Sequence, residues 1–315
     1  MKVLITGTNS YIGTSLLPVL LEKGHDIVCL VRNKRRFKQN SGFGDRVKII
    51  TGDLLKETSI EPVPPDIDAA YYLVHSLAAT PEFSRMEALS AHNFIQALNH
   101  TQCKQLIFLG DTGNADNPSQ LKYVLPTANA ALTVLRASII IGAGSPSFEI
   151  IRALTEKFRT IAAPRQVKTH CQPIAISDVL AYLEGVLLNT KAFNQNFDIG
   201  GPDLLSFKEL ILVYAEVKKL NRKVIVLPFL SSKLSAYWLH RVTQASYPLA
   251  QNLFNTMQHE TIMKDHRIDD VVPRRCLTYR EALALAMLKK SPDNAMPGDN
   301  GINGLQKEDE IIKKM

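Results

Sequence analysis

A glycine-containing turn between a short β-branched run and a longer amphipathic run constrains the fold of this chain more than any other feature. Residues 2–6 are typical of a buried strand, and residues 11–23 carry leucines and valines at helical spacing. The turn between them reads Thr6-Gly7-Thr8-Asn9-Ser10-Tyr11-Ile12-Gly13. Residues 26–31 predict the next strand, so strand, helix and strand follow within about 30 residues, as a right-handed crossover requires. Residues 2–31 therefore predict a βαβ unit.

The same alternation continues through the first half of the chain. Further strands are expected at residues 47–51, 69–74, 105–109 and 132–137. One long helix is expected at residues 81–100. Strands that alternate with helices form parallel sheets that are buried on both faces. The chain has 315 residues, 45% of them hydrophobic and 21% charged, which is enough for a large core. We therefore predict an α/β fold with a doubly wound parallel sheet.

After residue 145 helical patterns become more frequent. One of them starts with a capping box, in which Ser206 is followed three residues later by Glu209. The expected elements here are short strands at 173–176, 197–199 and 224–229, and helices at 148–158, 177–189, 210–220 and most of 231–290. We predict a sheet domain over residues 1–202, a smaller, mainly helical C-terminal lobe over 203–290 to which part of 143–172 contributes, and a flexible tail over 291–315.

The glycine-containing turn has the residues that hold a nucleotide diphosphate. Gly7 permits a tight turn, and backbone N–H groups at the start of the following helix attract a pyrophosphate. Gly13 lets that helix pack closely against the sheet. Ser10 departs from the usual glycine at the middle position, although its hydroxyl can donate to a phosphate. The alternative is an ordinary strand-to-helix turn that contains glycines.

The end of the second strand indicates which dinucleotide is bound. Arg32 lies nineteen residues after Gly13, where a carboxylate would select NAD by binding the ribose 2′-OH. Lys34, Arg35 and Arg36 follow, and residues 27–40 contain no acid. A guanidinium without a neighbouring acid pairs well with a 2′-phosphate, so NADP(H) is favoured over NAD(H). A solvated basic loop, or dual specificity, is the alternative.

Other polar residues follow the third, fourth and fifth strands, at the edge where open α/β sheets bind ligands. Asp53 can accept a hydrogen bond from the adenine amino group, or it can cap the next helix. The expected coenzyme contacts are Gly7, Thr8, Asn9, Ser10, Tyr11, Ile12, Gly13, Arg32, Asp53, Leu54, Val74, His75, Leu109 and Gly110. The candidates for catalysis near the nicotinamide are His75, Ser76, Asp111 and Thr112.

With these residues in place, the chain resembles the extended short-chain dehydrogenase/reductase superfamily, in its atypical NAD(P)-binding branch. The segment from Leu135 to Pro202 is similar to the NmrA-like/YbjT-type group. The motifs that carry the resemblance are Thr6–Gly13, Arg32, Gly52-Asp53-Leu54, Leu135–Gly142, Pro173–Val179 and Phe197–Pro202. The resemblance implies a Rossmann domain that binds NADP(H) and a C-terminal substrate lobe. It also implies either epimerisation of nucleoside-diphosphate sugars or NAD(P)H-dependent reduction.

One departure from that superfamily bears on the reaction. Its catalytic members use a Tyr-x-x-x-Lys pair on the helix after the fifth strand, where the lysine lowers the pKa of the tyrosine. Here Tyr123 is followed four residues later by Thr127, and Pro126 would break the helix. Tyr214 and Lys218 do have this spacing, but they lie in the second lobe, and we interpret them as an accidental surface pair.

These observations leave two main hypotheses for the function. The first is an NAD(P)H-dependent reductase of a quinone, flavin or carbonyl acceptor, because hydride chemistry belongs to the coenzyme. The second is a non-catalytic NADP(H) redox sensor or assembly factor with a protein partner. A nucleoside-diphosphate-sugar epimerase ranks last, because it would need the missing tyrosine and lysine. A small-molecule substrate is expected in the first case.

Charge and cysteine content exclude other classes of protein and site. The net charge is +7 and the pI is about 9.1, but the basic residues are spread along the chain and mixed with acids, so nucleic acid is not expected as a partner. The four cysteines lie far apart without metal-site spacing, which predicts no metal site and fits a reducing compartment. We find neither a signal peptide nor a transmembrane segment, so we expect a cytoplasmic protein.

Overall fold

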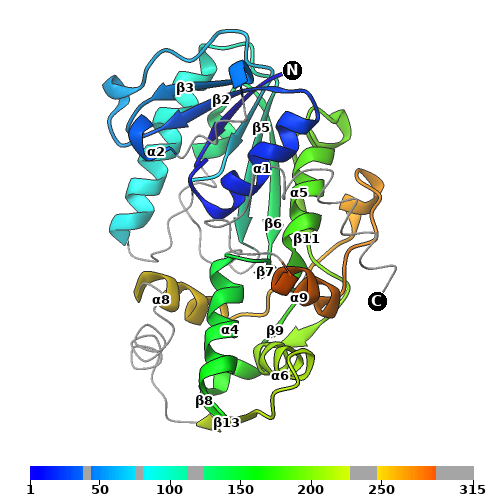
Figure 1. Ribbon diagram of the computed structural model, residues 1–315. Coiled ribbons are helices and arrows are strands. Elements are labelled where there is room, and N and C mark those ends of the chain that lie inside the picture. Colours follow the sequence, from blue (N-terminus) through cyan, green and yellow to red (C-terminus); the bar gives the residue numbers. More distant parts are fainter. Residues whose placement is uncertain (38–43, 75–80, 112–123, 228–246, 289–315) are drawn as a thin grey trace.

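A seven-stranded parallel sheet forms the centre of the molecule (Figure 1). The computed structural model describes residues 1–37, 44–74, 81–111, 124–227 and 247–288. The sheet order is β3-β2-β1-β4-β5-β6-β11, and each neighbouring pair runs parallel. The strands are β1 (Lys2–Thr6), β2 (Asp26–Val31), β3 (Val47–Thr51), β4 (Ala69–Tyr72), β5 (Gln105–Asp111), β6 (Ala131–Ala137) and β11 (Gln195–Ile199). The predicted α/β fold with a doubly wound parallel sheet is confirmed.

Helices cover both faces of this sheet, which explains why its strands are apolar on both sides. α1 (Tyr11–Glu22) and α5 (Ile176–Gly185) pack on one face through residues such as Leu16, Leu20 and Leu183. α2 (Pro81–Asn99) covers the other face with Phe94 and Ile95. In Figure 1, α2 lies on the left of the sheet, whereas α1 and α5 lie on the right. The strand order reverses between β1 and β4, which leaves a crevice for ligands at their carboxyl ends.

The end of α5 differs from the sequence expectation. The periodicity predicts a helix to residue 189, but α5 ends at Gly185, and Leu188 has a left-handed φ of 51°. The buried side chain of Gln105 on β5 replaces the next helical turn as a hydrogen-bond partner. Its Nε2 donates to Val186 O at 2.9 Å, and its Oε1 accepts from Leu188 N at 2.5 Å. A distant polar side chain therefore ends this helix.

A second lobe lies below the sheet in Figure 1 and has its own core. Its core joins residues before and after position 202, among them Phe148 and Leu154 on one side and Leu210 and Tyr279 on the other. Its helices are α4 (Pro146–Lys157), α6 (Phe207–Val217), α8 (Tyr247–Thr256) and α9 (Tyr279–Leu288). Its strand pairs are β7 (Ile140–Ile141) with β10 (Ile174–Ala175), β9 (His170–Cys171) with β12 (Leu205–Ser206), and β8 (Thr160–Pro164) with β13 (Lys223–Leu227). The capping box at the start of α6 is present.

Residues 257–278, which we call the return segment, were expected to be helical, but they are irregular apart from the short η8 (Arg267–Asp270). The segment runs back to the sheet and lies beside α5, where Figure 1 draws it in orange. The carboxylate of Asp198 accepts from Lys264 N at 2.9 Å, and that of Asp178 accepts from Leu277 N at 2.9 Å. Carboxylates of the sheet domain therefore satisfy backbone groups that a helix would have satisfied internally.

One of these carboxylates is fully buried and pairs with a cation of the return segment. Asp178 Oδ1 lies 2.6 Å from Arg274 Nε, and the Asp178 side chain has no exposed surface. Burial raises the pKa of the Asp178 carboxyl, and the guanidinium of Arg274 opposes that rise.

In the described ranges, no helix combines the length and the apolar character that a bilayer crossing needs.

Candidate coenzyme site

Steric contacts in the turn between β1 and α1 require glycine at two positions. Gly7 has a φ of 69°, and a Cβ there would lie 2.5 Å from the carbonyl oxygen of Leu73, which directly follows β4. A Cβ on Gly13 would overlap Gly7 O and would lie 2.7 Å from the Cα of Thr8. The backbone of the turn therefore lies directly against α1, as the sequence pattern predicts, and also against the end of β4.

The hydroxyls of the turn differ in their bonding. Ser10 caps α1, since its Oγ accepts from Gly13 N at 3.1 Å while its own amide donates to Gly7 O at 2.8 Å. Thr8 is 4% exposed, and within the described part of the chain its Oγ1 has no hydrogen-bond partner. A buried hydroxyl without a partner costs about 1–3 kcal/mol. Thr8 is therefore the residue of the turn whose polar group is left for a ligand.

A cavity of about 660 Å³ opens beside this turn, at the carboxyl ends of β1 to β4. It contains six of the predicted coenzyme contacts and brings together residues from four strand ends and from α2. Those six are Gly7, Thr8, Asn9, Arg32, Leu54 and Val74. The other lining residues are Thr6, Leu30, Val31, Asn33, Gly52, Leu55, Met86, Glu87 and Ser90. The volume is in the range of ligand-binding clefts.

The remaining predicted residues lie elsewhere. Ser10, Tyr11, Ile12 and Gly13 belong to the turn and the first turn of α1 but do not line the cavity, and Asp53 lies beside it. Leu109, Gly110 and Asp111 form the end of β5 and are not among the residues that line the cavity. His75, Ser76 and Thr112 lie outside the described residues, and so does Tyr123. Asp111 is therefore the one predicted catalytic candidate of the four that lies within the described residues.

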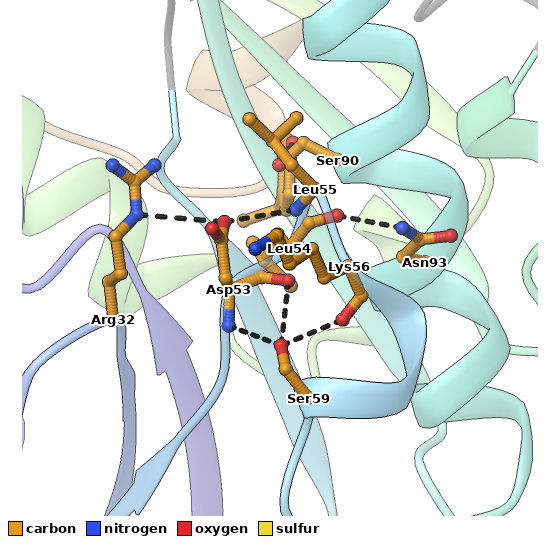
Figure 2. Close-up of polar contacts among 9 residues, drawn as sticks. Arg32, Asp53, Leu54, Leu55, Lys56, Ser59, Ser90 and Asn93 are labelled. Atoms are coloured by element: carbon orange, nitrogen blue, oxygen red, sulfur yellow. Dashed lines mark hydrogen bonds and ion pairs between the residues drawn. The ribbon is translucent and has the colours of Figure 1, made fainter.

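Arg32 has a neighbouring acid, contrary to the expectation from the local sequence. Its Nε lies 3.6 Å from Asp53 Oδ1, because β2 and β3 are adjacent and both residues follow the ends of these strands. Figure 2 shows the two terminal guanidinium nitrogens of Arg32 pointing away from Asp53. The side chain of Arg32 is 75% exposed. Residues 27–40 contain no acid, but the expectation of an unscreened guanidinium is wrong, because the acid comes from the neighbouring strand.

Asp53 is held firmly in its loop (Figure 2). Its Oδ1 accepts from Leu55 N at 3.1 Å, and its amide donates to Ser59 Oγ at 2.9 Å. Asn93 of α2 donates to Leu54 O at 2.8 Å, which ties the same loop to the helix. The Asp53 carboxylate thus stabilises the turn after β3, but it does not cap a helix, because the next helix η3 (Glu57–Ser59) has Lys56 as its N-cap. The contact with adenine stays a prediction.

Sequence reasoning did not single out the lining residues from α2. Met86, Glu87 and Ser90 come from a helix that is distant in sequence from the turn, and Ser90 accepts a hydrogen bond from Tyr72 Oη at 3.2 Å. The amphipathic pattern of α2 predicts a buried face toward the sheet. It does not indicate which part of that face extends past the strand ends into the cavity.

The Tyr214 and Lys218 pair was expected on the surface, but Tyr214 is fully buried in the second lobe. Its hydroxyl donates to Glu156 Oε1 at 2.7 Å. Burial raises the pKa of Tyr214, with the Glu156 carboxylate adding to the rise, whereas a catalytic tyrosine needs a lowered pKa. Lys218 follows the end of α6 and is exposed. The spacing is therefore accidental, as interpreted. Tyr214, however, belongs to the core of the second lobe and not to its surface.

Comparison with known families agrees with this geometry. Residues 7–140 match the model of a family described as NAD(P)H-binding. This part of the chain is similar to NAD(P)H-binding domains. The match includes the turn, Arg32, the Asp53 loop and the strands that frame the cavity, and it confirms the superfamily that the sequence motifs indicated. A nicotinamide coenzyme is therefore the ligand class that this match supports.

Solved structures share the fold of nearly the whole chain. The chain is similar to a nucleoside-diphosphate-sugar epimerase from Staphylococcus aureus, at 16% identity and a TM-score of 0.70, covering 90% of this chain and 99% of that one. It is similar to the triphenylmethane reductase of Citrobacter sp. in complex with NADP(H), at 16% identity and a TM-score of 0.71, covering 91% and 100%. The chain is also similar to an NADPH-dependent quinone oxidoreductase from Escherichia coli in complex with NADPH, at 14% identity and a TM-score of 0.70. This match covers 90% of this chain and 98% of that one. No curated protein sequence matches the chain significantly.

Proposed function

We propose that the protein is an NAD(P)H-dependent reductase that binds NADP(H) in preference to NAD(H) and reduces a quinone, flavin or carbonyl acceptor. The observation that carries the coenzyme assignment is the buried, unpaired hydroxyl of Thr8 in the wall of the cavity. A phosphate oxygen is the acceptor that this hydroxyl lacks, and the N-terminus of α1 next to it favours a negative charge.

Three parts of the coenzyme, the diphosphate, the 2′-phosphate and the adenine, have residues suited to hold them. Gly7, Thr8 and Asn9 would surround the diphosphate, and the exposed terminal nitrogens of Arg32 would face a 2′-phosphate. Leu54 and Leu55 supply apolar surface for the adenine ring. When bound, the coenzyme supplies a hydride. The residues of this chain bind and orient it, and the protein part of the chemistry is small.

The choice of acceptor rests on the absence of the usual acid–base pair from the sequence between Leu109 and Leu132. Quinones and flavins accept a hydride without a strong protein acid, because water can supply the proton. Two structural neighbours are described as reductases of a quinone and of a triphenylmethane dye, which supports this class of acceptor for the present chain. The same absence favours a second candidate, a non-catalytic NADP(H) sensor that recruits a protein partner.

The experiment that separates the two candidates measures turnover and binding independently. Purified protein is mixed with NADPH and a panel of quinones, flavins and aldehydes, and the absorbance of the reduced nicotinamide is followed. Coenzyme affinity is measured by calorimetry in the absence of acceptor. Oxidation of NADPH that depends on an acceptor supports the reductase. Tight binding without turnover on the whole panel supports the sensor, and no binding of either coenzyme overturns both.

A further inference from the structure

The pair formed by Arg32 and Asp53 leads beyond a simple preference for NADP(H). We infer that Asp53 opposes Arg32 in coenzyme selection, so that this site binds NADH as well as NADPH and the carboxylate limits the preference that Arg32 creates. The inference rests on the proposed function, because it concerns selectivity at the same cavity. It assigns a specificity-determining role to a residue at the edge of the cavity, between the lining residues Gly52 and Leu54.

The hydrogen bonds of its loop hold the carboxylate in place, whereas the guanidinium is largely exposed to solvent. Leu55 N and Ser59 Oγ hold Asp53, whose side chain is 28% exposed, whereas the Arg32 side chain is 75% exposed. Of Arg32, Lys34 and Arg35, only Arg32 lines the cavity. The charge that a ribose substituent meets at this end therefore depends on two residues of opposite sign, 3.6 Å apart.

The two coenzymes respond to this pair in opposite ways. The 2′-phosphate of NADPH would be attracted by Arg32 and repelled by Asp53. A phosphate that contacts Arg32 lies within one Debye length of the Asp53 carboxylate, because that carboxylate is 3.6 Å from Arg32. The ribose of NADH carries hydroxyls, which donate hydrogen bonds to a carboxylate, as in dinucleotide sites that select NAD. Removal of the negative charge therefore helps NADPH and harms NADH. Such an antagonistic change distinguishes a selectivity role from a role in loop structure.

Asp53→Asn tests this role without removing the loop contact, because an amide oxygen can still accept from Leu55 N. Dissociation constants for NADPH and NADH are measured by nicotinamide fluorescence, in wild type and variant. We expect NADPH to bind about threefold more tightly and NADH about threefold more weakly, a change of about tenfold in their ratio. The tightening of NADPH should shrink in high salt.

Glu57→Gln is the matched control, since Glu57 is an exposed carboxylate of the same loop that does not line the cavity. It should leave the ratio unchanged within about 1.5-fold, because its charge is more exposed to screening. An equal change for both coenzymes, an unchanged ratio, or selective weakening of NADPH in the Asp53→Asn protein overturns the inference alone. If the wild-type protein binds neither coenzyme, the proposed function fails together with it. Thermal unfolding of both variants verifies that they are folded.

Discussion

At the scale of single residues, the turn between β1 and α1 combines steric necessity with one unused polar group. Gly7 and Gly13 are required by contacts that a methyl group would violate, and Ser10 uses its oxygen to cap α1. The Thr8 hydroxyl satisfies neither need. Polar groups that a fold buries without a partner point to a ligand or an ordered water, and the position of Thr8 in the cavity wall favours a ligand.

Thr8→Val should separate binding from stability. Valine has the shape of threonine, so removal of the unpaired hydroxyl should leave the free energy of unfolding unchanged or raise it by about 1 kcal/mol. Coenzyme should bind about tenfold more weakly, because a hydrogen bond to a charged phosphate is lost. Urea unfolding and calorimetric titration measure the two quantities. A less stable protein with unchanged coenzyme affinity would contradict this account.

Gly7→Ala and Gly24→Ala form a matched pair at positive φ. A Cβ at Gly24, where φ is 82°, meets nothing within 4 Å, so this variant should lose only about 1 kcal/mol of stability. Gly7→Ala adds the contact with Leu73 O and should lose about 3 kcal/mol or more, together with coenzyme binding. Denaturant midpoints compare the two variants. Equal losses would mean that the turn does not lie tightly against the end of β4.

How far the site follows from sequence depends on whether its contacts are local. Gly7, Gly13 and Arg32 are recognisable because each stands at a fixed distance from a strand or helix boundary. The pairing of Arg32 with Asp53 cannot be recognised in this way, because the two residues follow different strands that are adjacent only in the folded sheet. Each residue was singled out separately. Ser90 and Met86 depend on how far α2 extends over the strand ends, which the pattern does not encode.

At the scale of elements, the strands of the sheet could be predicted and the return segment could not. Both faces of β1 or β2 are buried, so an apolar run is sufficient to identify them. Residues 257–278 adopt an irregular path because Asp178 and Asp198, which lie far away in sequence, accept from its backbone. Helical periodicity in this stretch describes only an intrinsic preference, which tertiary hydrogen bonds override.

Asp178→Asn should loosen the return segment. The substitution removes the charge that pairs with Arg274 and should lower the free energy of unfolding by about 2–3 kcal/mol, less than for a fully buried pair because the Arg274 side chain is 29% exposed. Arg280→Gln breaks an exposed ion pair with Glu216 and should cost less than about 0.5 kcal/mol. Urea denaturation gives both values, and limited proteolysis should show earlier cleavage within residues 257–278 for Asp178→Asn. Equal stability of the two variants would refute the anchoring role.

At the scale of the whole molecule, the second lobe is built from two distant parts of the chain. Residues 139–175 supply Phe148, Ile151 and Leu154 to the same core as Leu210 and Tyr279 from residues 207–286. A cut at residue 202 would divide this core, and part of 143–172 was expected from the sequence to contribute to the lobe. Which residues of that segment enter the shared core does not follow from the sequence, because each half carries a helical pattern of its own.

A fragment of residues 1–202 should therefore not behave as an independent domain. Without α6 and α9, the apolar faces of α4 and β8 would be exposed to water, and the fragment should aggregate or lose the fixed packing of residues 139–175. Size-exclusion chromatography and an amide NMR spectrum test this, with residues 1–288 as the control. A monomeric fragment with native-like dispersion would show that the sheet domain is autonomous.

The order of the strands also has consequences for how the protein acquires its structure. Val3 on β1 lies beside Ala69 on β4, and Gln195 on the edge strand β11 lies beside Thr133 on β6, so both pairs join residues widely separated along the polypeptide. Large loops must close before such pairs become favourable, and this slows folding relative to chains with mostly local contacts. During that delay the apolar strand edges can associate between molecules. Refolding from denaturant should accordingly be slow and its yield should fall at high protein concentration, which makes assistance by chaperones valuable to this topology.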